Sequence, residues 1–133
     1  MKVILKNSSL TFQKGMTETD ITLTQGHSYI NRNTGALTTD ENVDALLSDF
    51  IPVAGVTKFS AKLLYGWGVC PYWFYDSNQD PISDSCAEYN SQSETIRNTN
   101  TSFDDDISTF PSGAAYIRFS SYRDNNLYAK KYS

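Results

Sequence analysis

Histidine, cysteine and helical periodicity are all scarce in this sequence of 133 residues, which contains one histidine and two cysteines. A Ser–His or Cys–His nucleophilic site needs a third group that orients the histidine, and no motif such as G-x-S-x-G accompanies His27. The sequence therefore predicts a protein that is not an enzyme.

Positive charge is also in short supply, with 11 Lys and Arg against 15 Asp and Glu and a net charge of -4. Nucleic-acid-binding domains usually display a basic patch or stripe, so we expect no nucleic-acid partner. The length fits one domain of ordinary size.

Long apolar runs are missing as well. No stretch approaches the roughly 20 apolar residues of a membrane-spanning helix. Near the start, the apolar run Val3-Ile4-Leu5 is shorter than the core of about 7 to 15 residues in a signal peptide. We expect no membrane partner, and synthesis in a cytosol without a signal peptide.

The two cysteines, Cys70 and Cys86, do not match a zinc-binding spacing such as C-x-x-C. A disulfide needs suitable geometry and an oxidising compartment. We expect two free, buried thiols, and the sequence leaves their pairing open.

Alternation with period two dominates the pattern and predicts strands. It is clearest over residues 56–63, 115–120 and 127–132, and an apolar run covers residues 69–75. Pro71 within that run indicates the start of a strand, an edge or a bulge. The predicted core consists of alternating apolar residues, namely Leu23, Phe59, Ala61, Leu63, Tyr72, Phe74, Ile117 and Phe119.

One segment, Glu41–Ser48, could form two helical turns after the N-cap that Thr38–Asp40 offers. We read the polar stretch 83–100 as a loop. The predicted fold is all-β: an antiparallel, jelly-roll-like β-sandwich with a short N-terminal strand or arm. Residues 1–20 are assigned to an attachment or oligomerisation segment and residues 21–133 to the sandwich.

Aromatic residues are abundant, at 14% of the chain, and suggest a carbohydrate platform because sugars stack their C–H faces on flat rings. The candidate platform residues are Trp67, Trp73, Tyr75, Tyr89 and Tyr122. Trp73 and Tyr75 share one face of their strand and Tyr72 and Phe74 the other, so one of these faces must be core. The alternative is that most of these rings are core or interface residues.

Calcium is the cofactor for which the sequence offers candidates. Asp76, Asn78 and Asp80 have the opening spacing of a calcium loop, although Pro81 replaces the required glycine. A plain β-turn is the alternative. A second candidate is the acidic run that contains Asp104 and Asp106, which solvent and salt could equally accommodate.

Several short sequence segments, called words below, resemble a β-sandwich module of bacteriophage tail, baseplate and head-fibre proteins, especially in phages of gut Bacteroidales. The words lie within residues 26–122 and are Tyr29-Ile30-Asn31, Asn33-Thr34-Gly35, Ser48-Asp49-Phe50-Ile51-Pro52-Val53, Trp73-Phe74-Tyr75-Asp76-Ser77-Asn78 and Phe110-Pro111-Ser112-Gly113-Ala114-Ala115-Tyr116-Ile117-Arg118-Phe119-Ser120. The resemblance implies a jelly-roll sandwich of the carbohydrate-binding type in a virion. It supplies no catalytic residue.

The opening residues 1–13 also resemble the start of small virion proteins from such phages, where this segment would serve attachment. Val3, Ile4 and Leu5 are the candidate assembly residues, because a short strand can add to a sheet edge of a neighbour. Outward-pointing Lys58, Lys62 and Arg118 could pair with acids across a subunit contact. Expected partners are other virion proteins and further copies of the chain, in a homotrimer.

The expected function is a non-enzymatic structural or adhesive component of a phage virion, in a tail fibre, head fibre or decoration protein, that contacts host surface glycans. A carbohydrate-binding module is the alternative. A glycan-degrading enzyme is the third hypothesis, and it requires two carboxylates that flank a sugar, roughly 5 to 10 Å apart. The acidic residues here lie mostly in predicted turns, which favours solvation over hydrolysis.

Overall fold

The computed structural model describes residues 16–66, 68–83 and 101–133, and within these ranges the chain forms strands and no helix. The strands are β1 (Glu18–Ile21), β2 (Thr24–Gly26), β3 (Ser28–Ile30), β4 (Leu37–Thr39), β5 (Ala45–Leu47), β6 (Ile51–Pro52), β7 (Lys58–Tyr65), β8 (Tyr72–Tyr75), β9 (Thr101–Ile107), β10 (Tyr116–Tyr122) and β11 (Tyr128–Tyr132). None of the described segments could cross a membrane as a helix.

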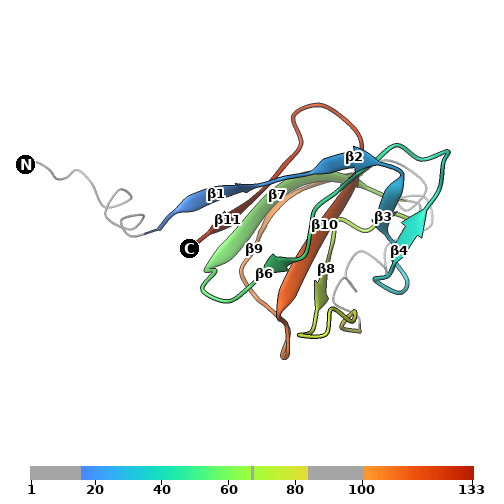
Figure 1. The fold of residues 1–133 in the computed structure, drawn as a ribbon. Helices are drawn as coiled ribbons and strands as arrows, with labels where there is room; N and C mark the ends of the chain where they lie inside the picture. The colour runs from blue at the N-terminus through green and yellow to red at the C-terminus, as the bar shows by residue number, and fades with distance from the viewer. Residues whose placement is uncertain (1–15, 67, 84–100) are drawn as a thin grey trace, which may run out of the picture.

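Two antiparallel sheets make up the body of the domain (Figure 1). Sheet A has the strand order β1-β11-β7-β9. Sheet B has the order β2-β5-β10-β6, and β8 pairs with β10 as well. A hairpin of β3 and β4 stands beside them. This architecture confirms the predicted all-β sandwich of antiparallel strands, whereas the jelly-roll connectivity stays a prediction.

The main core lies between the two sheets. Strand β7 alternates along its whole length, so Phe59, Ala61 and Leu63 are fully buried while their neighbours are half-buried. They meet Ile117 and Phe119 of β10, and the rings of Phe59 and Phe119 lie 5.8 Å apart. Because the alternation of hydrophobicity matches the pleat, these predicted core residues are confirmed. Leu23 and Tyr72 pack against the cluster at its margin and are half-buried.

A second cluster lies on the other side of sheet B. Trp73 and Tyr75 of β8 pack there with Ile30 and Cys70. A Cβ at Gly35 would overlap the indole ring of Trp73, and Gly35 has a φ of 76°, so the loop before β4 lies directly against this ring. Strand β8 is therefore buried on both faces, because the β3–β4 region covers the face that the sequence left open.

Two expectations are wrong. The segment expected to be helical, Glu41–Ser48, contains strand β5, which pairs with β2 on one side and β10 on the other. Tertiary pairing overrides a weak local helical signal here, and Ala45 and Leu46 are buried. Cys70 is buried as expected but is disulfide-bonded rather than a free thiol. Cys86, the other cysteine of the sequence, lies outside the described residues.

The remaining strand predictions hold where they can be compared. Pro71 stands immediately before β8, which agrees with a strand start. Strand β1 begins at Glu18 and pairs with β11, so residues 18–20 belong to sheet A. The assembly candidates Val3, Ile4 and Leu5 lie outside the described residues, as do residues 84–100 of the loop predicted over 83–100.

Candidate functional site

The proposed aromatic platform is not assembled by the residues that the structure describes. Trp73 and Tyr75 are 2% and 3% exposed. The Trp73 indole Nε1 donates to the Ile82 carbonyl at 2.9 Å, and the Tyr75 hydroxyl donates to the Gly35 carbonyl at 2.7 Å. Burial raises the pKa of Tyr75 well above its usual range. The two rings are structural, and their prediction as exposed sugar-binding residues is wrong.

The other platform candidates do not join them. Tyr122 is half-buried, and its hydroxyl donates to the Gly66 carbonyl at 3.2 Å. Burial is also the main cause that raises the pKa of Tyr122. Trp67 and Tyr89 lie outside the described residues.

The first calcium candidate is a turn that closes on itself. One carboxylate oxygen of Asp76 accepts the backbone amides of Asn78 at 2.8 Å and Asp80 at 3.0 Å. Gln79 adopts a left-handed φ of 65° within the same turn. The Asp76 carboxylate thus stabilises the backbone of the connection after β8, as the turn alternative predicted.

The second calcium candidate lies on β9, an edge strand of sheet A. The Asp106 carboxylate accepts a hydrogen bond from Lys58 Nζ at 3.1 Å. Hydrogen bonds from Lys58 and Ser60 lower the pKa of Asp106. Asp104 lies opposite Lys62 in the β7–β9 register. Over residues 16–66, 68–83 and 101–133, no group of three or more His, Cys, Asp or Glu side chains is placed to hold a metal ion.

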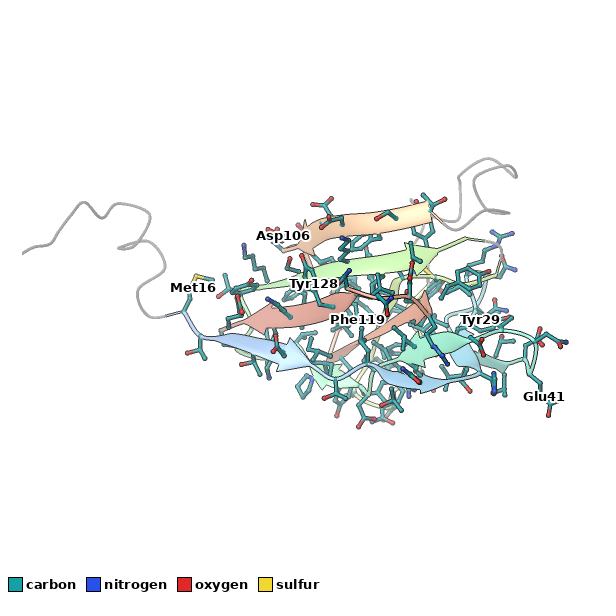
Figure 2. The ribbon with its side chains drawn as sticks, turned by 90° about the horizontal axis from the view of Figure 1, so that it is seen from above. Met16, Tyr29, Glu41, Asp106, Phe119 and Tyr128 are labelled. Carbon is teal, nitrogen blue, oxygen red and sulfur yellow. The ribbon has the colours of Figure 1, made fainter. Side chains whose placement is uncertain are left out.

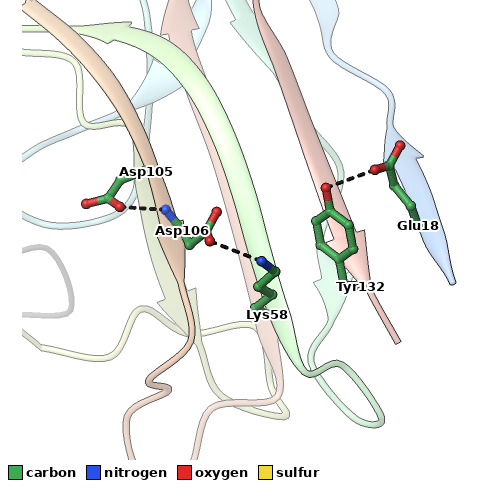
Figure 3. Close-up of polar contacts among 5 residues, drawn as sticks. All are labelled: Glu18, Lys58, Asp105, Asp106 and Tyr132. Carbon is green, nitrogen blue, oxygen red and sulfur yellow. Dashed lines mark hydrogen bonds and ion pairs between the residues drawn. The ribbon is translucent and has the colours of Figure 1, made fainter. Parts of the chain in front are cut away.

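A polar network spans the outer face of sheet A (Figure 3). The Tyr132 hydroxyl donates to Glu18 at 2.9 Å, and Lys130 Nζ lies 3.3 Å from the other Glu18 oxygen. The hydrogen bond from Tyr132, and then the one from Lys130, lower the pKa of Glu18. Lys58 lies 4.9 Å from the centre of the Tyr132 ring. Lys58 and Lys130 therefore have acidic partners within their own chain, so Lys58 is not free to pair with an acid of a neighbouring subunit.

A cleft of about 650 Å³ opens at the other edge of the sandwich, where β1 and β2 follow one another along the two sheets and β6 lies across from them (Figure 1). Ligand pockets usually have volumes of about 300 to 1,000 Å³. The cleft is lined by residues 19–22, 24–28, 47–49, 51 and 52, together with Arg118 and Lys131.

Arg118 is held in a defined orientation at this cleft. Its Nε donates to the Ser48 carbonyl at 2.7 Å, and its guanidinium carbon lies 4.4 Å from the centre of the Phe50 ring. Partial burial lowers the pKa of Arg118, but an arginine stays charged. Among the described residues no carboxylate forms an ion pair with it, so the two terminal nitrogens of its guanidinium remain available.

The local chain path explains this position. Ser48 leaves the β5 ladder, and its hydroxyl accepts the Phe119 amide at 2.9 Å while its own amide donates to the Phe119 carbonyl. Residues 48–50 therefore interrupt the edge of sheet B between β5 and β6. The carbonyl of Ser48 and the ring of Phe50 are left beside the Arg118 side chain.

Lys131 reaches the cleft from sheet A. It lies opposite Thr19 in the β1–β11 register and shares its strand face with the buried Ala129. Within the described parts of the chain it forms no ion pair and no side-chain hydrogen bond. The same holds for the side chains of Thr19, Thr24 and Gln25 in the wall of the cleft.

His27 also lines the cleft, with Nδ1 3.0 Å from the Val43 carbonyl and 3.8 Å from the Asp44 carboxylate. The carbonyl is an acceptor only, so Nδ1 is the donor in this contact. In the described structure, no hydroxyl or thiol side chain hydrogen-bonds to His27.

Sequence reasoning identified Arg118 as outward-pointing but missed the cleft. The available signal was the segment Ser48-Asp49-Phe50 between two short apolar segments, since a break of this kind leaves carbonyls unpaired at a sheet edge.

Comparison with family models, curated proteins and solved structures finds no match to this chain.

Proposed function

We propose that this chain is a non-enzymatic structural and adhesive component of a bacteriophage virion, in a tail fibre, head fibre or decoration protein, and that its cleft binds a glycan of the host surface. The observation that carries the proposal is the cleft itself. It is bounded by strands of both sheets, its volume suits a sugar unit, and its lining includes cations, hydroxyls and an amide without partners among the described residues.

The phage assignment is supported by where the resembling words lie in the fold. The word Trp73–Asn78 forms β8 and the start of its turn, and the word Phe110–Ser120 covers most of β10 and the loop before it. These segments pair with each other at the centre of sheet B. The resemblance therefore involves strands of the core rather than a surface loop.

The disulfide at Cys70 agrees with a role outside the cytoplasm. Disulfides persist in oxidising surroundings, including virion surfaces, and are rare in the cytosol. A virion component that is made in the bacterial cytoplasm and released by lysis meets such conditions after release.

Assembly belongs to the same proposal. The partners are other virion proteins and further copies of the chain, and a homotrimer is the expected state. Strands β1 and β2 support it because both are exposed edge strands, with one side of each unpaired within the described sheets. Edge strands of this kind can accept a strand from a neighbour.

Two measurements test the proposal. Immunogold labelling of phage particles from the source bacterium should decorate the virion, and the purified chain should bind cells of the host strain until soluble surface polysaccharide competes it off. Unlabelled particles together with no binding to cells would remove both parts of the proposal.

A free carbohydrate-binding module is the second candidate, favoured by the polar lining of the cleft. It predicts cell binding without labelled particles. A glycan-degrading enzyme would need paired carboxylates, and Asp20 and Asp49 both line the cleft. Release of reducing ends from host polysaccharide, lost in the Asp49→Asn variant, would favour the enzyme over a binding domain.

A further inference from the structure

We infer that the cleft selects an acidic sugar, whose carboxylate is bound by the guanidinium of Arg118 with Lys131 as the second cation. This inference rests on the proposed glycan-binding function and names the ligand class of the same cleft.

Charge pairing distinguishes Arg118 and Lys131 from two lysines on the outer face of sheet A. Lys58 and Lys130 on the outer face of sheet A each have an acidic partner, at 3.1 and 3.3 Å. Arg118 and Lys131 have none among the residues described. Two cations that line one cleft and form no ion pair can attract an anion, and the partial burial of Arg118 strengthens that attraction because solvent screens it less.

The two carboxylates that line the cleft, Asp20 and Asp49, form no ion pair with Arg118 or Lys131. Asp20 lies opposite Lys130 in the β1–β11 register and helps to raise the pKa of that lysine. Asp49 is exposed, and its charge acts to raise the pKa of Arg118, but it forms no ion pair with that arginine. An anionic group can therefore reach the guanidinium without displacing a bound carboxylate.

The geometry of Arg118 favours a planar carboxylate. Its Nε is already used by the Ser48 carbonyl and its face by the Phe50 ring, so the plane of the guanidinium is fixed before a ligand arrives. The two terminal nitrogens then present parallel N–H groups that match the two oxygens of a carboxylate. Fixing this group in advance reduces the entropy that binding would cost.

The rest of the lining suits a sugar ring. Thr19, Thr24 and Gln25 offer hydroxyl and amide groups that can donate to and accept from sugar hydroxyls. No aromatic side chain lines the cleft, so recognition rests on hydrogen bonds and charge rather than on ring stacking. Acidic and neutral sugars of the same shape should consequently differ in affinity.

The experiment titrates the full chain with D-glucuronate and, as the matched neutral probe, D-glucose, and follows the Arg118 Nε–H and the amides of Ser48 and Asp49 by NMR. We expect saturable shifts with glucuronate that weaken as salt is added, and none with glucose at the same concentration. Arg118→Lys keeps the charge but loses the paired N–H groups, and should weaken glucuronate binding by about tenfold or more, the value of a charge-assisted hydrogen bond.

Lys131→Gln provides a variant that should keep its melting temperature, because the described structure gives the Lys131 side chain no partner to lose. It should weaken glucuronate binding a few-fold. Equal responses to both sugars, no response to either, or unchanged glucuronate binding in both variants would overturn the inference. Host-cell binding that persists in Arg118→Lys would overturn the acidic-ligand inference alone, while labelled virions and cell binding would still uphold the proposed function.

Discussion

The outer faces of the two sheets differ, although both sheets are antiparallel. The outer face of sheet A stays open among the described elements and carries Tyr128 (Figure 2). Lys130 and Tyr132 share this face, because they alternate with Tyr128 along β11. The outer face of sheet B carries Trp73 and Tyr75, which are almost fully buried beneath the β3–β4 region. Sheet A therefore has one solvent-exposed face, whereas sheet B is packed on both faces.

The difference shows that sheet B is the middle layer of the domain. Its central strand β10 connects the layers through buried serines. The Ser120 hydroxyl accepts the Ile30 amide at 3.0 Å and donates to the Cys70 carbonyl at 2.6 Å. The Ser121 hydroxyl accepts the Leu64 amide of sheet A at 2.8 Å. Removing a side chain from the covered face should therefore cost far more stability than removing one from the open face.

The largest effect is expected for Trp73→Ala, which should lower the free energy of unfolding by about 3–5 kcal/mol because it empties the centre of the covered face. Denaturant melts should show this loss. The matched control is Tyr128→Ala on the open face, where a half-buried ring is removed and a change below about 1 kcal/mol is expected. Similar losses in the two variants would contradict the proposed difference between the faces.

Gly35→Ala should come next. Alanine must adopt a left-handed φ there and its Cβ would overlap the Trp73 ring, so we expect about 2–4 kcal/mol from strain and overpacking together. Gly113→Ala separates the two causes, since Gly113 has a φ of 82° but nothing within 4 Å of the added Cβ. Equal melting temperatures for the two variants would show that Trp73 does not contact this loop.

Ser120→Ala should cost about 1–3 kcal/mol, because the Ile30 amide and the Cys70 carbonyl would lose their buried partner. Hydrogen exchange should show faster exchange at the Ile30 amide. Ser102→Ala is the control on the open face, where the serine is exposed, and its stability should be unchanged. Protection of the Ile30 amide that survives in Ser120→Ala would argue against this link between layers.

The smallest effect concerns pH. Lys58 holds the pKa of Asp106 below its ordinary value of about 4, so the pair stabilises the fold above that pH and the contribution is lost as pH falls through the lowered value. The pair is substantially exposed, so solvent screening limits its contribution to below about 1 kcal/mol. Melts of wild type and Asp106→Asn should differ slightly at pH 6 and converge near pH 2. A gap that widens on acidification would contradict the ion pair.

The alternating pattern was enough to predict β7, β10 and the main core, because burial of every second residue follows directly from the pleat of a half-buried strand. Strand β5 could not be predicted in this way. It has three residues, and its two partners, β2 and β10, lie far from each other in sequence. The same limit applies to the cleft, whose lining includes residues of β1, β2, β3, β5, β6, β10 and β11.

The sequence by itself determined that the chain builds sheets with one apolar face, since hydrophobic periodicity is a local property of each strand. Only the tertiary structure decided that Trp73 and Tyr75 are core residues, because a continuous apolar strand does not reveal what covers its second face. Only the tertiary structure placed Arg118 and Lys131 at one cleft, because their proximity depends on how strands that are distant along the chain pair and stack.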